Sequence, residues 1–245
     1  MTGTGAALRP VVEPGGAEWI ARRLLPWWSL PGGEMPVGAI IPVGFDAYAR
    51  ILHSAYRLTG GHETHVSWRE FAAEAGVTPH AEMQWDEITP STGRLGAERL
   101  HRPPDEGHLP ADEAEILVEV LQRHTRAPDR CWFAVWEGYG GLEPDVRWPE
   151  AARLHLPNRD YVLLWGPVEA AARSFEPAPF RQSANLWWPD DQAWCVATEI
   201  DYSWTYVGGT RPCIDDLLAE SRLEVLPIRS DQRASGRRST GAQPG

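Results

Sequence analysis

The sequence predicts an α+β fold with a mixed, mainly antiparallel central sheet and flanking helices. Short apolar runs rich in Trp, Val, Tyr and Ile are bounded by turn residues, which is typical of strands. Segments with apolar residues at helical spacing alternate with these runs, and several connecting turns are short. The sequence contains no Gly-rich nucleotide-binding loop. Together these observations favour an α+β or mixed-sheet domain.

The N-terminal part begins with residues 1–16, which are rich in Gly, Thr, Ala and Pro without periodicity and are expected to be disordered. A short helix is expected over residues 17–25, ending at Pro26. Residues 37–56 predict two strands around a turn at residues 42–45. A helix is the alternative for the second of these strands.

The clearest local signal is a helix start. Ser67 with Glu70 forms a capping box, and Val66 with Phe71 occupies the two positions of a hydrophobic staple. Gly76 is expected to end this helix.

The central part combines a loop, two helices and two strands. Residues 89–110 are polar and contain several prolines, which predicts a long loop. The strongest helix signal spans residues 110–124, with one apolar face and acidic residues in its first turns. Strands are expected at residues 131–137 and 161–165, and a helix that begins with proline at residues 168–175.

Tryptophans concentrate in the C-terminal part. A strand is expected over residues 193–200 and a shorter one over residues 204–207. A Gly-Gly turn should end the second strand. Thr210 should then cap a helix over residues 211–220, because its hydroxyl can accept from an otherwise unpaired backbone N–H. Residues 223–228 predict a last edge strand.

Two of these strands are similar in sequence. Superposing the strand that ends at Glu137 on the strand that ends at Glu199 also aligns a tryptophan and an aspartate. Each strand follows an Asp-containing turn and is filled with apolar residues. If the two strands are neighbours in one sheet, both glutamates should lie near the same edge.

Length and charge bound the organisation and the partners. A chain of 245 residues can form its own core, and a single domain over residues 17–228 is predicted. Residues 229–245 are expected to form a disordered, Arg-containing tail with four arginines and one aspartate, or +3. The total charge is −11, so the remainder carries −14. Such a charge disfavours nucleic acids and anionic membranes and favours a basic protein partner.

Cysteine usage and hydropathy indicate a cytoplasmic protein. The three cysteines form no CxxC pair and are expected to be reduced and buried. The N-terminus lacks a basic region followed by an apolar run, and no stretch is long and apolar enough to predict a membrane-spanning helix.

Three carboxylates, Glu137, Glu199 and Asp201, are the candidate acid/base residues. Hydrolysis of a glycosidic bond needs two carboxyl groups in different environments, and nearby tryptophans suit stacking on sugar rings. The alternative is that strand-end carboxylates are ordinary surface residues of an acidic protein.

A second set of residues lies in turn-rich sequence and could contact a ligand: Trp187, Trp188, Asp190, Asp191 and Trp204. Core filling is the alternative for the tryptophans, because each can bury a large apolar area.

The remaining motifs predict neither a metal site nor a cofactor site. His62 and His65 could share a helix face, but the adjacent glycines favour a loop and no third ligand is identifiable. Gly208 and Gly209 precede a helix without the lysine of a P-loop, so helix capping explains them better than anion binding.

Three motifs resemble a family of uncharacterised bacterial proteins, and the similarity covers about residues 37–226. These motifs are DRCWFAVWEGYG, LPNRDYVLLWGPVEAA and NLWWPDDQAWCVATEIDYSWTYVGGT. The resemblance implies a folded domain and assigns no site. In architecture and acidity alone, the chain is also similar to the SUKH group of immunity proteins, which bind and neutralise toxins.

The sequence therefore favours a non-enzymatic binding protein that engages a basic protein, as an immunity protein would. The alternative is a hydrolase that uses Glu137 with Glu199 or Asp201. A purely structural or interaction domain is a third hypothesis.

Overall fold

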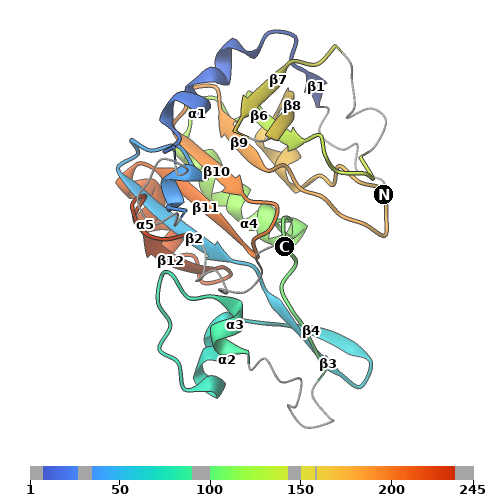
Figure 1. Cartoon of the computed structure of the whole chain (residues 1–245), viewed down its shortest axis with the longest axis vertical. Coiled ribbons are helices and arrows are strands. Elements are labelled where there is room, and N and C mark those ends of the chain that lie inside the picture. The colour runs from blue at the N-terminus through green and yellow to red at the C-terminus, as the bar shows by residue number, and fades with distance from the viewer. Residues whose placement is uncertain (1–7, 27–34, 90–99, 143–149, 158, 235–245) are drawn as a thin grey trace, which may run out of the picture.

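The predicted α+β architecture, with a mainly antiparallel sheet and flanking helices, is confirmed (Figure 1). The computed structural model describes residues 8–26, 35–89, 100–142, 150–157 and 159–234. The larger of two sheets has nine strands in the order β1-β8-β6-β9-β10-β11-β2-β12, with β7 paired to β8. The strand pairings within it are all antiparallel among the described residues. Its strands are β1 Arg9–Pro10, β2 Ala47–Leu52, β6 Cys131–Trp136, β7 Arg153–Leu156, β8 Arg159–Gly166, β9 Leu186–Pro189, β10 Trp194–Thr198, β11 Trp204–Gly209 and β12 Glu224–Ile228.

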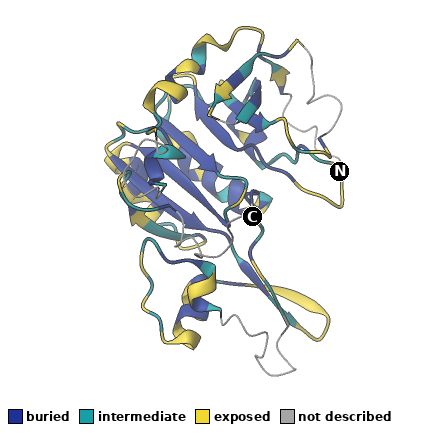
Figure 2. Ribbon diagram, in the orientation of Figure 1, coloured by how far each residue is buried: buried dark blue, intermediate teal, exposed yellow. Residues whose placement is uncertain are grey.

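Both faces of this sheet are buried (Figure 2). Side chains on successive strand residues point to opposite faces, so Trp187 and Trp188 of β9 belong to two different core clusters. This double burial explains why the central strands are apolar throughout rather than alternating. One face packs against α4 Ala111–Leu121, α5 Arg211–Leu218 and the 3₁₀ helix η6 Val168–Ala172. The other packs against α1 Glu18–Arg23, α2 Trp68–Ala75 and the 3₁₀ helix η3 Val37–Ala39.

A second, three-stranded sheet projects from the main body beside α2 and α3 Trp85–Ile88 (Figure 1). It contains β3 Ala55–Thr59, β4 His62–Val66 and β5 Leu100–Arg102, in the order β4-β3-β5. Thr59 pairs with His62, so Gly60 and Gly61 form a two-residue turn, and both have positive φ. This is the geometry that two glycines favour in a hairpin. The expected loop at His62 and His65 is therefore a strand.

The locally encoded helix ends are confirmed. The Ser67 hydroxyl accepts from the Glu70 N–H at the start of α2, and Gly76 follows that helix with a φ of 70°. Thr210 caps α5 by accepting from the Cys213 N–H. The strong central helix signal corresponds to α4, which continues into the 3₁₀ helix η4 Gln122–His124.

Several expected elements differ in kind. The first expected strand within residues 37–56 is replaced by η3, whereas the second is β2. The helix expected at residues 168–175 is the shorter 3₁₀ helix η6. Gly208 and Gly209 do not break the chain but complete β11. A Cβ atom on Gly208 would lie 2.6 Å from the Phe45 ring, so a glycine here lets β11 pass close to Phe45.

Three segments expected to lack regular structure are partly ordered. Within residues 1–16, β1 pairs with β8, and the Val11 carbonyl accepts from the Ala152 N–H. The expected loop at residues 89–110 includes β5. Within residues 229–245, the Ser230 carbonyl accepts from the Gly38 N–H. The rest of these three predictions, at residues 1–7, 90–99 and 235–245, lies outside the described residues.

Candidate functional site

The two similar strands, β6 and β10, lie in the same sheet but are not neighbours. β9 separates them and pairs antiparallel with both, which corrects the expectation that they lie side by side. Because each is antiparallel to β9, β6 and β10 run parallel to each other. Glu137 and Glu199, which follow them, therefore lie toward the same end of the strands.

Glu137 is held by an ion pair at this end of the strands. Its carboxylate accepts from Arg153 Nε at 2.6 Å, and its backbone N–H donates to the Asp160 carbonyl at 3.1 Å. The Glu137 side chain is 44% exposed. This arrangement joins the end of β6 to β7 and β8.

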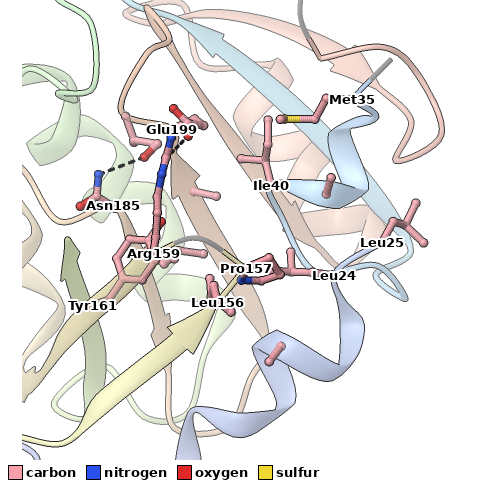
Figure 3. Close-up of a pocket in the computed structure, with 15 residues that line it drawn as sticks. Leu24, Leu25, Met35, Ile40, Leu156, Pro157, Arg159, Tyr161, Asn185 and Glu199 are labelled. Carbon is pink, nitrogen blue, oxygen red and sulfur yellow. Dashed lines mark hydrogen bonds and ion pairs between the residues drawn. The ribbon is translucent and has the colours of Figure 1, made fainter. Parts of the chain in front are cut away.

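Glu199 lies in a cavity of about 170 Å³ (Figure 3). Its side chain is only 13% exposed and accepts from the Arg159 guanidinium and, at 2.6 Å, from the Asp201 backbone N–H. Arg159 also lies 3.6 Å from the Asp201 carboxylate, which is 73% exposed. Tyr161 and Asn185 complete the polar wall. Glu199 and Asp201 are candidates from the sequence, whereas no sequence signal indicates Arg159, their shared partner.

The opposite wall of the cavity is apolar. Figure 3 shows Leu24, Leu25, Met35 and Ile40 across from the Arg159 and Glu199 side chains. These residues come from the end of α1 and from the segment around η3. Leu156 and Pro157 close the cavity between the two walls. The described lining residues do not include Glu137, so the structure does not bring Glu137 and Glu199 into one pocket.

Burial controls the acidity of Glu199. Loss of solvent raises the pKa of Glu199 above its ordinary value, although the Asp201 N–H and the Arg159 guanidinium oppose this effect. The negative charge of Asp201 raises the Glu199 pKa further. A buried, arginine-bound carboxylate of this kind can bind a cationic or hydrogen-donating group. It lacks the second cavity carboxylate at the separation that glycoside hydrolysis requires.

At least one of Trp187, Trp188 and Trp204 was expected to be exposed at a contact surface, but all three are buried, which corrects that expectation. Trp187 packs against Trp194 with its ring centroid 5.2 Å away, and Trp188 packs against Trp19 at 6.1 Å. Trp204 is 5% exposed and covers the guanidinium of a buried arginine. These tryptophans fill the core, as the alternative interpretation proposed.

Asp190 and Asp191 stabilise the turn between β9 and β10. Asp190 accepts from the Trp132 indole N–H at 3.1 Å. Asp191 accepts from the Thr125 hydroxyl and the Arg126 N–H, both at 2.8 Å. Asp190 therefore connects this turn to β6 and Asp191 connects it to the segment that follows α4, which explains both carboxylates without a ligand.

Two buried charged residues were missed by sequence analysis. Arg50 in β2 is fully buried, and Glu113 in α4 is 5% exposed. Glu113 accepts from the Ser54 N–H at 2.9 Å, while its other carboxylate oxygen has no hydrogen-bond partner among the described residues. An arginine inside the strand sequence AYARIL was the available signal, because a charge within an apolar strand requires burial or an exposed edge.

His53 starts a buried chain of polar groups across β11 and β10. Its Nδ1 faces the Asp105 carbonyl, so Nδ1 donates and Nε2 accepts from the Thr205 hydroxyl. Thr205 in turn hydrogen bonds to Thr198 at 2.7 Å. Burial lowers the pKa of His53 to about 3, so His53 is neutral at physiological pH. Because these polar side chains hydrogen bond to one another, their burial has a structural explanation.

An acidic surface covers the outer side of α4 and α5. Five exposed carboxylates belong to these helices, and we call them the acidic helical face: Asp112, Glu115, Glu119, Asp215 and Asp216. The two helices pack against each other. Ion pairs from Arg123 to Asp216 and from Arg222 to Glu119 connect them.

Within the described residues, no group of three or more His, Cys, Asp or Glu side chains is placed to hold a metal ion. His62 and His65 lie on β4, where the His65 ring contacts Tyr56. All three cysteines are buried, and burial raises the pKa of Cys131 and Cys213 to about 12. Among the described helices, none has the length and apolar character needed to cross a membrane.

Comparison of the chain with protein-family models, curated proteins and solved structures found no match.

Proposed function

We propose that this protein is a non-enzymatic binding protein whose acidic helical face engages a basic protein, in the manner of an immunity protein. The observation that supports the proposal most directly is the charge on α4 and α5. Five exposed carboxylates outnumber the three exposed arginines there, Arg123, Arg211 and Arg222, and Arg123 and Arg222 already pair with carboxylates. Glu115 and Asp215 form no ion pair within the described part of the chain, so they keep their charge for a partner.

α4 and α5, which carry this surface, are anchored in the hydrophobic core. Leu117 and Leu121 of α4 and Ile214 and Leu217 of α5 are fully buried in the core. An interface built on two anchored helices loses little conformational entropy on binding. Leu218 of α5, 36% exposed, adds an apolar contact within the acidic helical face.

The charge of the whole chain supports the same kind of partner. With residues 229–245 set aside, the chain carries −14, and a field of that sign attracts a basic protein and speeds its association. It also repels nucleic acid phosphates, so we expect no nucleic acid partner. The hydrolase alternative has less support, because Glu137 and Glu199 are each bound by a different arginine.

The test uses the small basic proteins encoded beside the gene, purified one at a time. Calorimetry should detect one that binds, with an affinity at least about tenfold lower in 0.5 M salt than in 0.05 M salt, because salt screens exposed charges. The double variant Glu115→Arg/Asp215→Arg should abolish binding.

A matched control places the same charge reversal elsewhere. Asp86 and Glu106 are also exposed carboxylates, and Asp86→Arg/Glu106→Arg should retain most of the affinity. If no neighbouring basic protein binds, or if the two double variants lose affinity equally, the assignment of the acidic helical face is wrong.

A further inference from the structure

On the polar wall of the cavity at Glu199, hydrogen-bond donors are paired with protein groups to a greater extent than acceptors are. Asn185 donates its amide hydrogens to the Tyr139 hydroxyl at 2.9 Å and to the Thr198 carbonyl at 3.3 Å. Arg159 directs its guanidinium at Glu199 and Asp201. Both amide hydrogens of Asn185 are therefore aimed at protein acceptors, whereas the guanidinium of Arg159 faces two carboxylates.

Acceptor capacity remains at Glu199. Each carboxylate oxygen has two lone-pair sites, and each oxygen of Glu199 accepts one hydrogen bond from the described residues. Asp201 lies outside the described lining of the cavity, is largely exposed and meets Arg159 through one oxygen. A ligand that donates hydrogen bonds would therefore find free lone pairs here.

The charges at the polar wall point in the same direction. Glu199 and Asp201 carry two negative charges against the single positive charge of Arg159, which leaves the group at −1. One ligand ammonium would bring the set to zero, whereas a ligand carboxylate would bring it to −2. The net negative charge of this group attracts a cation and repels an anion, so a cation is favoured.

The apolar wall indicates the size and polarity of the rest of the ligand. Leu24, Leu25, Ile40 and Leu156 surround the space in front of Glu199 and offer no charged group (Figure 3). The cavity volume of about 170 Å³ is close to that of an engineered apolar cavity of about 150 Å³ that accepts benzene. An apolar body of about six carbons fits this space.

We propose that the cavity binds a small primary amine, with its ammonium group on Glu199, next to the exposed Asp201 carboxylate, and a short apolar chain against the α1 and η3 wall. Three ammonium hydrogens suit a site that offers carboxylate acceptors. Binding needs no rearrangement of the sheet, because Glu199, Arg159 and Asn185 are fixed at the ends of paired strands. This site lies on the opposite sheet face from the acidic helical face and does not depend on it.

The experiment compares three probes of equal chain length by calorimetry at pH 7.5: hexylamine, 1-hexanol and hexanoate. Hexylamine should saturate one site with a dissociation constant of about 1 mM or below, the range open to so small a ligand. The alcohol should bind at least about tenfold more weakly, and hexanoate should show no saturation. Absence of saturable hexylamine binding would overturn the proposal. Equal binding of the alcohol, or preferred binding of hexanoate, would show that the carboxylates do not select the ligand.

Variants locate the binding. Glu199→Gln should weaken hexylamine at least tenfold, and Asp201→Asn about threefold. Ala39→Leu adds bulk at the apolar wall, where Ala39 is partly exposed, and should abolish binding. Asp86→Asn, on the distant α3, is the control and should bind as the original protein does.

Because Glu199 is buried, its variant needs a second measure. If Glu199→Gln does not fold, the probe series and the surface variant Asp201→Asn still decide the outcome. Unchanged affinity in both Asp201→Asn and Ala39→Leu would show that hexylamine binds elsewhere and would overturn the assignment.

Discussion

Beneath α4 and α5, the nine-stranded sheet is covered by aliphatic side chains together with Trp187 and Trp194, whereas its opposite face holds Arg50 against Trp204. Both faces are buried, but the second also contains the cavity at Glu199. The first face depends on apolar area and close packing for its stability. The two faces also differ in the polar strand residues they bury. Thr198 and Thr205, on the first face, which we call the packed face, are neutral, whereas Arg50 on the second face is charged.

Arg50 shows how the second face accommodates a charge. Its Nη1 donates to the Ala81 carbonyl at 2.7 Å, and its guanidinium lies 3.9 Å from the Trp204 ring centroid and 5.6 Å from that of Trp68. Nε and Nη2 have no hydrogen-bond partner among the described residues. Burial lowers the pKa of Arg50 to about 10, so Arg50 remains charged at neutral pH. Aromatic rings thus replace the usual carboxylate partner.

The largest effect should come from the packed face. Trp194→Ala should lower the free energy of unfolding by about 3–5 kcal/mol, because Trp194 is fully buried and its indole donates to the Leu121 carbonyl. Urea unfolding monitored by far-UV circular dichroism measures this change. The control, Trp165→Ala, removes a partly exposed tryptophan and should cost clearly less. Equal losses would mean that the packed face does not dominate stability.

The next effect depends on pH and concerns Glu113 at the margin of the packed face. Burial raises the pKa of Glu113 from 4.5 to about 7, so the folded state binds a proton that the unfolded state releases. Stability is therefore lost as pH rises from about 4.5 through about 7, by at most about 3 kcal/mol.

Glu113→Gln isolates this effect, because glutamine is uncharged and can still accept from the Ser54 N–H. The variant should match the original protein near pH 4 and be more stable by about 1–3 kcal/mol at pH 8. Unfolding in urea at several pH values measures the difference. A difference that stays constant over this range would show that Glu113 does not titrate as its burial implies.

The smallest effect is expected at Arg50. Arg50→Met removes a buried charge, two of whose nitrogens have no hydrogen-bond partner among the described residues, and keeps an extended side chain. The free energy of unfolding should therefore change by less than about 1 kcal/mol. Arg50→Lys keeps the charge but loses the planar contact with Trp204, and should cost more than Arg50→Met. If methionine proves the worse replacement, the charge itself stabilises the second face.

Local signals explain which elements could be predicted. The helix starts at Ser67 and Thr210 are encoded within a few residues, and both caps form as expected. The hairpin of β3 and β4 was missed because its second strand is polar and exposed and so lacks an apolar pattern. Its Gly60-Gly61 turn was the signal that could have revealed it.

The tryptophans of β9 show a second limit of sequence reasoning. Pro189 and Asp190 indicated a turn, and the preceding Trp187 and Trp188 were assigned to it. The pairing of β9 with β6 on one side and β10 on the other makes it an inner strand, which buries both rings. Sequence spacing does not reveal which strands lie on either side.

The candidate site was predictable only in part for the same reason. The similarity of β6 and β10 predicts that Glu137 and Glu199 lie near one edge if the two strands are neighbours. The strands are not neighbours, although they are parallel and both glutamates follow them. The separation of the two glutamates by β9, and the contact between Glu199 and Arg159, arise from pairings distant in the chain. The apolar wall, supplied by α1 and η3, had no sequence signal connecting it to Glu199.

The position of β2 determines how the chain can fold during synthesis. Its two neighbours, β11 and β12, both come from the last part of the sequence, more than a hundred residues later. β2 therefore leaves the ribosome long before either partner strand has been synthesised. Apolar residues such as Ile51 and Leu52, which are buried in the folded protein, remain exposed to solvent until then. Nascent chains that stop before β11 cannot complete the main sheet and expose a natural target for chaperones and proteases.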